Sequence, residues 1–323
     1  MKILVIRFSS IGDVIWASPV LRCLKQQLPN AEVHLCTKAA YAEMFEANPY
    51  LDKMHLLGKE GLKVLVKQLQ AEKFDYVIDL HKNFRSFYLR LHLKAPVYSY
   101  QKLSFEKWLL VQFRINRLPQ KHTADRYLDT LRPLGVVPDG QGLDYFVPER
   151  FQLPADYLPP SHRSGYAAFV IGASYFTKKL PPAKMLELCA AIKQPIVLIG
   201  GPEDQANAQA LCTAYQAAYP ERAPLTNTCG QLSISQSAWL LQHAELVYGH
   251  DTGLTHIAAA FQKKIYSIWG STVPEMGLFP YKTTSIIIEN KELACRPCSR
   301  MGKKKCPKGH FACMNSLRFE NLP

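Results

Sequence analysis

The chain has 323 residues, of which 48% are hydrophobic and 20% are charged, and its formal net charge at pH 7 is +13. This composition is typical of a folded protein, and the length accommodates two domains of ordinary size. No apolar run approaches the roughly 18 residues of a membrane span, and Arg7 interrupts the first run, which argues against a secretory signal. We therefore expect a cytoplasmic protein. The positive charge favours anionic partners such as phosphorylated substrates, nucleic acid or an anionic membrane surface, unless it serves solubility alone.

The first half of the chain alternates between predicted strands and helices. Strands are predicted at residues 2–7, 32–36, 53–57 and 76–80, and helices at 14–28, 39–47 and 61–71. Gly12 allows the backbone to approach a ligand, and Asp13 lies at the mouth of the first βα unit, where open α/β sheets bind ligands. Asp13 is then either a catalytic group or a carboxylate that only favours the helix N-terminus. The spacings of a dinucleotide fingerprint and of a P-loop are both absent.

A basic region follows the strand at 76–80. Residues 81–86 form a predicted loop at the same sheet edge as Asp13, so Arg85 and its neighbours are candidates for binding an anionic group, or else a solvated loop. Residues 103–118 predict a basic amphipathic helix, which either lies on an anionic membrane or packs on its own domain. Another helix is predicted at 122–131. The stretch rich in Pro and Gly at 138–160 predicts a domain boundary, giving domains at 1–155 and 156–323.

The second half repeats the alternation, with strands predicted at 166–172, 195–199, 246–248 and 264–269. Lys178 lies in the loop after the first of these strands, where an ammonium group would neutralise phosphate. Asp251 is a natural N-cap for a helix, and Thr252 and His256 lie at helical spacing, so this stretch is either an anion site or an ordinary capped helix. The two halves predict an α/β fold of two Rossmann-like, doubly wound domains facing across a cleft.

The nine cysteines fall into two groups. Five are scattered among apolar neighbours and are expected to be reduced core residues: Cys23, Cys36, Cys189, Cys212 and Cys229. The other four crowd the C-terminus, as Cys295, Cys298, Cys306 and Cys313, with His310 nearby. These residues provide enough ligands for a tetrahedral zinc site. The alternative is that they are packed thiols that tie the tail to the domains.

Four motifs together resemble glycosyltransferase family 9, the heptosyltransferase type. They are Ser-Ser-Ile-Gly-Asp-Val at 9–14, Thr-Lys-Lys-Leu-Pro at 177–181, Gly-Gly-Pro-Glu at 200–203 and Asp-Thr-Gly-Leu-Thr-His at 251–256. The Cys-Arg-Pro-Cys stretch at 295–298 and the later Cys-Met pair also look like family members. Two positions depart from the family pattern: Leu180 stands where Trp is usual, and His250 where a small or amide residue is commoner.

The resemblance implies two Rossmann-like domains of the GT-B type and inverting transfer of heptose from ADP-heptose to the lipopolysaccharide inner core, with no cofactor or metal required. It implies that Asp13 is the general base and that Lys178 binds the donor phosphates. Donor-binding residues would be Gly12, Ser174, Thr177, Lys178, Glu203, Asp251, Thr252, Gly253 and His256, and acceptor-binding residues Ser10, His81, Asn83 and Arg85. Asp251 would repel a diphosphate, so we expect it to cap its helix and orient neighbouring groups.

The partners implied are a nucleotide-sugar donor, an anionic glycolipid acceptor and the cytoplasmic face of the inner membrane. Two other functions stay open at this point. The first is a sugar-nucleotide epimerase or phosphorylase of the same architecture. The second is a non-enzymatic nucleic-acid-binding protein, against which the absence of a recognisable nucleic-acid module argues.

Overall fold

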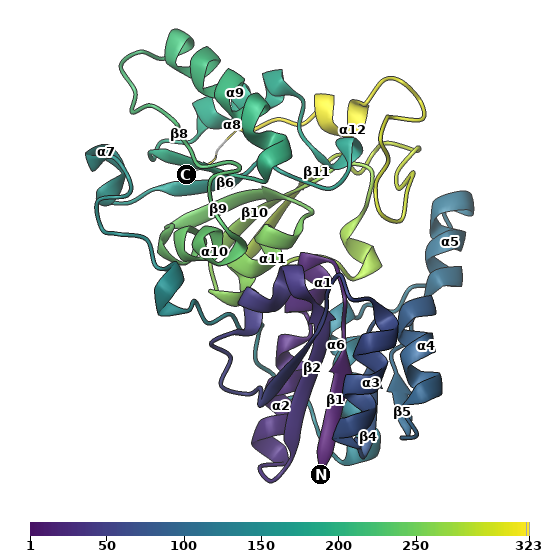
Figure 1. Ribbon diagram of the computed structural model, residues 1–323. Coiled ribbons are helices and arrows are strands. Elements are labelled where there is room, and N and C mark those ends of the chain that lie inside the picture. The colour runs from purple at the N-terminus through teal and green to yellow at the C-terminus, as the bar shows by residue number, and fades with distance from the viewer. Residues whose placement is uncertain (321, 323) are drawn as a thin grey trace. The chain divides into compact units, whose positions relative to one another are not determined.

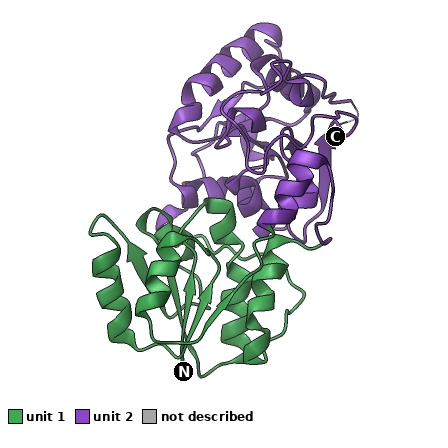
Figure 2. Ribbon diagram, turned by 90° about the vertical axis from the view of Figure 1, so that its right-hand side faces the viewer, with its two compact units in different colours: residues 1–103, 121–148 green, residues 104–120, 149–323 purple. Residues whose placement is uncertain are grey.

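The computed structural model describes residues 1–320 and 322, which divide into two compact units. Unit 1 comprises residues 1–103 and 121–148, and unit 2 comprises residues 104–120 and 149–323 (Figure 2). This division differs from the predicted boundary at 155/156 in two respects. The boundary falls at 148/149, and residues 104–120 belong to unit 2. The second difference arises because Leu110 packs with Val273 and Met276, more than 160 residues later in the chain.

Unit 1 is a five-stranded parallel sheet flanked by helices (Figure 1). Its strands are β1 (Lys2–Ile6), β2 (Glu32–Lys38), β3 (Lys53–Leu57), β4 (Tyr76–Asp79) and β5 (Val97–Ser99), in the order β3-β2-β1-β4-β5. Its helices are α1 (Ile11–Ile15), α2 (Ser18–Gln27), α3 (Leu62–Glu72), α4 (Phe84–His92) and α6 (Thr123–Leu128), with 3₁₀ helices η1 (Ala39–Phe45) and η2 (Asp129–Leu134). The residues of β1 from Ile3 to Ile6 are fully buried on alternating faces, because helices cover both sides of a parallel sheet.

Unit 2 is a six-stranded parallel sheet in the order β11-β10-β9-β6-β7-β8. Its strands are β6 (Ala167–Val170), β7 (Ile196–Ile199), β8 (Thr226–Asn227), β9 (Leu246–His250), β10 (Lys264–Trp269) and β11 (Ser285–Glu289). Its helices are α5 (Ser104–Phe113), α7 (Pro160–Arg163), α8 (Pro182–Ala191), α9 (Gln205–Ala218), α10 (Ile234–His243), α11 (Gly253–Ala260) and α12 (Ala312–Asn315). Four 3₁₀ helices complete it: η3 (Glu149–Phe151), η4 (Phe176–Lys178), η5 (Pro202–Asp204) and η6 (Pro274–Met276).

Several local predictions need correction. Residues 39–45 form a 3₁₀ helix rather than an α-helix. Helix α5 ends at Phe113 instead of continuing to residue 118, because Arg114 takes the left-handed conformation with φ of +61°. The strand predicted at 246–248 continues to His250, so the N-cap of α11 is Thr252 and Asp251 is free for another role. The predicted loop at 81–86 already contains the start of α4, which Asn83 caps by accepting from the amides of Arg85 and Ser86.

No helix among the described residues has the length and hydrophobicity that crossing a bilayer requires.

Candidate functional site

Each sheet has a topological switch point, where consecutive connections leave in opposite directions. In unit 1 the switch lies between β1 and β4, and in unit 2 it lies between β6 and β9. Ligands of open α/β sheets bind outside the carboxyl ends of the strands at such points. Asp13 follows β1 and His81 follows β4, whereas Lys178 follows β6 and Asp251 follows β9. The predicted residues therefore stand at the position that the topology favours in each unit.

Asp13 in unit 1 is held by a salt bridge and two hydrogen bonds. One carboxylate oxygen lies 2.8 Å from Nη2 of Arg7, and the other accepts from the amide (3.2 Å) and hydroxyl (3.1 Å) of Ser10. Burial raises the pKa of Asp13, but the charge of Arg7 and the bonds from Ser10 outweigh it, so the pKa is lowered. The carboxylate is thus kept ionised and oriented, while its side chain stays 31% exposed.

Arg7 is a further candidate residue, which the sequence alone showed only as the residue that interrupts the first apolar run. It is 6% exposed, and its Nη1 donates to the carbonyl of Leu80, which joins the ends of β1 and β4. Its guanidinium also lies 5.6 Å from the ring centroid of Tyr127. The signal available in the sequence was its place in the same strand-to-helix turn as Asp13.

His81 and Asn83 form a second polar group at this edge. Asn83 donates to Nε2 of His81 at 2.7 Å, so the proton of the neutral ring belongs on Nδ1, a buried atom with no hydrogen-bond partner among the described residues. Burial, and then the charge of Arg7, lower the pKa of His81 to about 4. Of the other acceptor candidates, Ser10 bonds to Asp13, and the side chain of Arg85 is exposed.

Lys178 and Asp251 form the central pair of unit 2. Their side chains meet at 2.6 Å, and Nζ of Lys178 also donates to the carbonyl of Asp251 at 3.3 Å. The hydroxyl of Thr272 donates to the same carboxylate at 2.9 Å. Asp251 therefore positions Lys178 rather than capping α11, which corrects the predicted capping role. The side chain of Lys178 is 13% exposed and that of Asp251 is 6% exposed.

The two positions that depart from the family pattern contact each other. Nε2 of His250 accepts from the amide of Leu180 at 2.9 Å. Burial is the largest of the effects that lower the pKa of His250 to about 3, so the ring is a neutral acceptor. At the preceding position, a Cβ on Gly249 would lie 2.3 Å from Oγ1 of Thr255, which itself donates to the carbonyl of His250. Gly249 thus permits β9 and α11 to approach closely.

The remaining donor candidates divide by burial. Thr252 and Gly253 are half-buried at the start of α11, where the side chain of Thr252 makes no capping bond, and His256 is buried in the same helix. Ser174 and Glu203 are exposed. Gly12 lies elsewhere, on α1 of unit 1. Thr177 adjoins Lys178 in η4 and is buried, with its hydroxyl bonded to Ser271 and Lys303.

The four clustered cysteines lie in the tail of unit 2. Cys313 is buried, whereas Cys295, Cys298 and Cys306 are half-buried, and the sulfur of Cys295 is 4.0 Å from Nε2 of His310. Burial is the largest cause that raises the pKa of Cys313, to about 11, and the thiols of Cys298, Cys295 and Cys306 add to the rise. The same kind of mutual effect acts on Cys298 from Cys295 and Cys306. The four thiols therefore lie in one neighbourhood.

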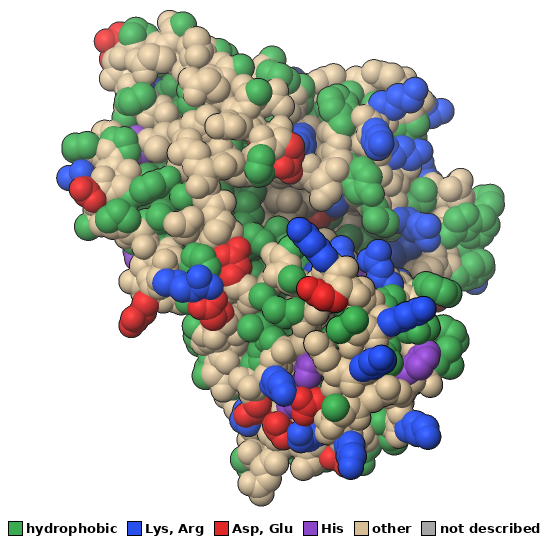
Figure 3. Space-filling model, viewed as in Figure 1, with side chains coloured by type: hydrophobic (Ala, Val, Ile, Leu, Met, Phe, Trp, Pro, Cys, Tyr) green, Lys and Arg blue, Asp and Glu red, His purple; other side chains and the backbone are tan. Residues whose placement is uncertain are grey.

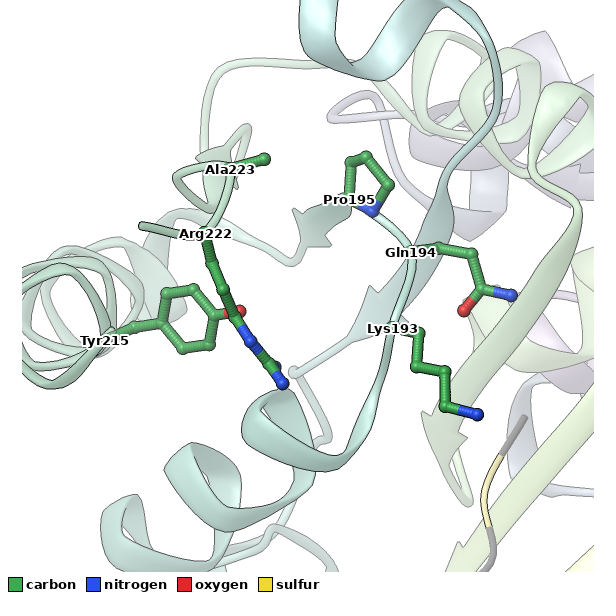
Figure 4. A pocket seen from close by; sticks show the side chains of 6 residues that line it. All are labelled: Lys193, Gln194, Pro195, Tyr215, Arg222 and Ala223. Atoms are coloured by element: carbon green, nitrogen blue, oxygen red, sulfur yellow. The ribbon is translucent and has the colours of Figure 1, made fainter. Parts of the chain in front are cut away.

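A pocket in unit 2 lies away from these residues. It is lined by Lys193, Gln194, Pro195, Tyr215, Arg222 and Ala223 (Figure 4). Residues 193–195 immediately precede β7, so the pocket lies at the amino end of that strand. The candidate residues lie at carboxyl ends, and this pocket is therefore not part of the proposed site.

Two doubly wound parallel sheets, each with an ion pair at its switch point, form an α/β architecture that binds ligands at the carboxyl ends of its strands. The family described as glycosyltransferase family 9 (heptosyltransferase) matches residues 62–308, and the chain belongs to this family. It is a glycosyltransferase, which confirms the predicted family and enzyme class.

Comparison with individual proteins agrees with this assignment. Lipopolysaccharide heptosyltransferase 1 of Escherichia coli K12 is 25% identical over 299 residues, covering 85% of this chain and 89% of that protein. A family 9 glycosyltransferase from Veillonella parvula has a TM-score of 0.78 at 21% identity, covering 99% of this chain and 94% of the other. The structure of E. coli heptosyltransferase WaaC with ADP has a TM-score of 0.69 at 21% identity, covering 89% and 93%. The predicted fold of two doubly wound α/β halves is confirmed.

Proposed function

We propose that the protein transfers a heptose, or a closely related sugar, from an ADP-sugar donor to the inner core of lipopolysaccharide, with inversion and without a metal in the reaction. The relatives support the sugar, the acceptor and the nucleotide: one is named a lipopolysaccharide heptosyltransferase, and another was determined with ADP. The net charge of +13 suits an acceptor that carries carboxylates and phosphates.

Unit 2 is proposed to hold the donor. The first amides of α11 have no partner within the helix, and they favour an anion together with the partial positive charge of the helix N-terminus. Lys178, held at this edge by Asp251, adds a full positive charge for the diphosphate. As the bond from sugar to diphosphate breaks, these groups stabilise the charge that builds on the leaving oxygen. The exposed Glu203 and Ser174 are then available for hydroxyls of the donor.

Unit 1 is proposed to supply the base, and the observation that carries this assignment is the contact of Asp13 with Arg7 and Ser10. The contact keeps Asp13 in the carboxylate form that accepts a proton. In the reaction the acceptor hydroxyl attacks the anomeric carbon and gives its proton to Asp13, while the electron pair of the breaking bond leaves with ADP. A single displacement of this kind inverts the anomeric configuration. Ser10, His81, Asn83 and Arg85 would orient the anionic acceptor.

The test is a transfer assay with ADP-heptose and a purified inner-core acceptor, together with calorimetry for ADP. We expect Asp13→Asn to lower kcat by about 10²–10⁴-fold and to leave the Kd for ADP nearly unchanged. Glu43→Gln, on the neighbouring η1 helix, is the matched control. Normal turnover by Asp13→Asn would remove the base assignment. Donor conversion without any acceptor would instead identify an epimerase or phosphorylase.

We further propose that α5 contacts an anionic membrane surface, where a lipid-anchored acceptor resides. Its aromatic side chains Phe105, Trp108 and Phe113 are 62%, 42% and 58% exposed and contact one another. The opposite side of the helix packs inward through Leu110. Hydrophobic and basic side chains gather where α5 lies (Figure 3). Cosedimentation with vesicles of anionic phospholipid should fall in a Trp108→Ser variant, and equal binding by the two proteins would refute the contact.

A further inference from the structure

The tail of unit 2 is anchored to loops of the proposed donor site at several points. The amide of Cys298 donates to the carbonyl of Ser271 at 3.1 Å, and the amide of Lys303 donates to Oγ1 of Thr177 at 2.8 Å. Arg296, which is 8% exposed, bonds to the carbonyls of Gly270 and Thr272. These contacts bring residues 296–303 to the carboxyl ends of β6 and β10.

The last cysteine reaches the same place from a different part of the tail. Cys313 lies in α12, next to Met314, and a Cβ on Gly270 would lie 2.7 Å from Cε of Met314. Cys306 packs against the core cluster that contains Cys313 and Met314. Cys295 is tied to this end of the tail by His310, at 4.0 Å. The stretches that carry Cys295, Cys298 and Cys313 thus contact the loop at Gly270, and Cys306 packs against the same core cluster as Cys313.

We propose that Cys295, Cys298, Cys306 and Cys313 bind one thiophilic metal ion of the Zn²⁺ class in a structural site. Four thiolates in tetrahedral geometry with no open position form a closed structural centre, and the spacing begins with the C-x₂-C pair that such sites use. Binding converts four thiols and one divalent ion into a tetrathiolate complex of charge −2 and releases four protons. Basic residues flank the ligands and offset that charge: Arg300, Lys303, Lys304, Lys305 and Lys308.

Among the described residues no three of the four sulfur atoms lie within 4.8 Å of one another, so closing the site requires the stretches that carry them to draw together. A different group of three chelating side chains does meet this distance among the described residues: His34, His55 and Glu72. Beyond the anchor at Lys303, residues 304–310 are mostly exposed and contain Gly309 with positive φ and open space around it, so the backbone near Cys306 is suited to small adjustments.

The group around His34 is a poor competitor for a cation. The carboxylate of Glu72 already contacts the ammonium groups of Lys2 at 2.9 Å and Lys53 at 2.5 Å, and these charges would oppose a metal ion. The ring nitrogens of His34 are also occupied, by His55 and by a glutamate on the same strand. The tail offers four thiol ligands, one more than the three chelating side chains of the group around His34.

The proposed ion would stabilise the donor side of unit 2. It would fix the tail against Thr177 and Ser271, whose hydroxyls are 2.8 Å apart, and against Thr272 through Arg296. Thr272 in turn bonds to Asp251, which holds Lys178. This consequence rests on the proposed function, whereas the metal site itself does not.

The test is a titration of the reduced, metal-stripped full chain with Zn²⁺, and with Co²⁺ as a spectroscopic probe. We expect one ion per chain, with the thiolate-to-metal charge transfer and strong visible absorption of tetrahedral Co²⁺. Each Cys→Ser change at the four positions should weaken binding on the order of tenfold or more. Cys212→Ser, at a half-buried thiol outside the tail, is the matched control and should bind as the wild type does.

Elemental analysis of protein purified without chelator then shows whether zinc or iron occupies the site. A reduced wild-type chain that binds neither ion, or a Cys298→Ser/Cys306→Ser variant that binds as tightly as the wild type, would overturn the proposal. Because the wild-type titration needs no variant to fold, it decides the question alone. Metal binding without transfer activity would contradict the proposed function and leave the metal site standing. Transfer activity without metal binding would overturn the metal site and leave the proposed function standing.

Discussion

Replacing Arg7 by Gln tests how unit 1 controls its carboxylate. Arg7 is the only full positive charge in direct contact with Asp13 among the described residues, at 2.8 Å. Without it, burial becomes the dominant influence, and burial favours the protonated carboxyl. We therefore expect the pKa of Asp13 to rise when Arg7 is replaced, while the hydrogen bonds from Ser10 still lower it.

An opposite charge at this distance shifts a carboxyl pKa by about 1–3 units, and each unit corresponds to about 1.4 kcal/mol. Because the side chain of Asp13 is 31% exposed, solvent screens the interaction, and we expect a shift at the lower end of this range. The acidic limb of the kcat/KM profile should move to higher pH by the same amount. Since Arg7 lowers the folded-state pKa, its contribution to stability is present above the unfolded-state pKa of Asp13. That contribution is lost as pH falls through the folded-state value.

Two measurements check the shift. The first is the pH profile of kcat/KM, and the second is the carboxyl ¹³C titration of Asp13 by NMR, assigned with Asp13→Asn. Arg22→Gln is the matched control, since Arg22 is also buried and pairs with Asp139 and Asp144 in the same unit. It should lower the free energy of unfolding without moving the acidic limb. An Asp13 titration that is unchanged in Arg7→Gln would refute the reasoning.

Three further predictions follow from individual contacts. Lys178→Ala should weaken ADP binding by roughly tenfold or more, as expected for loss of a charge-assisted contact of about 1.5–3 kcal/mol. The control Lys184→Ala, on the nearby helix α8, should bind ADP as the wild type does. Equal ADP affinities of Lys178→Ala and the wild type by calorimetry would contradict the assignment. Gly249→Ala should lower the free energy of unfolding by about 1–3 kcal/mol, because the new Cβ meets Thr255, and an unchanged denaturation midpoint would count against that packing. His81, with a pKa of about 4, should stay neutral from about pH 5 to 8 in ¹⁵N NMR. Because its folded-state pKa lies below the unfolded-state value, it favours folding above about pH 6.5, and this contribution is lost as pH falls towards 4.

The alternation of strands and helices was predictable because it is written in local periodicity. Buried strands such as β6 and β7 are continuous apolar runs, and each is followed by a turn rich in Gly or Pro. Because the strands are parallel, their carboxyl ends lie at one edge of each sheet, so the positions of Asp13 and Lys178 at these edges were predictable from the sequence.

The partners of these residues were not predictable in the same way. Asp251 has the local pattern of an N-cap, but it pairs with Lys178, which precedes it by 73 residues, and with Thr272 from the next strand end. Similarly, α5 lies in the first half of the sequence, yet its Leu110 packs against Val273 and Met276 of unit 2. Contacts between segments so far apart depend on the whole fold, and no local pattern encodes them.

The two ion pairs at the switch points have opposite polarity toward solvent, and this difference suits their proposed roles. In unit 1 the cation is enclosed, with the side chain of Arg7 7% exposed, and Asp13 is the outward partner at 31%. In unit 2 the carboxylate is enclosed, with Asp251 6% exposed against 13% for Lys178. Unit 1 therefore presents an anionic oxygen, which suits the proposed base, and unit 2 presents an ammonium group, which suits the proposed contact with phosphate. In both pairs the buried partner holds the outward group in place, so replacing the buried partner should impair the proposed function.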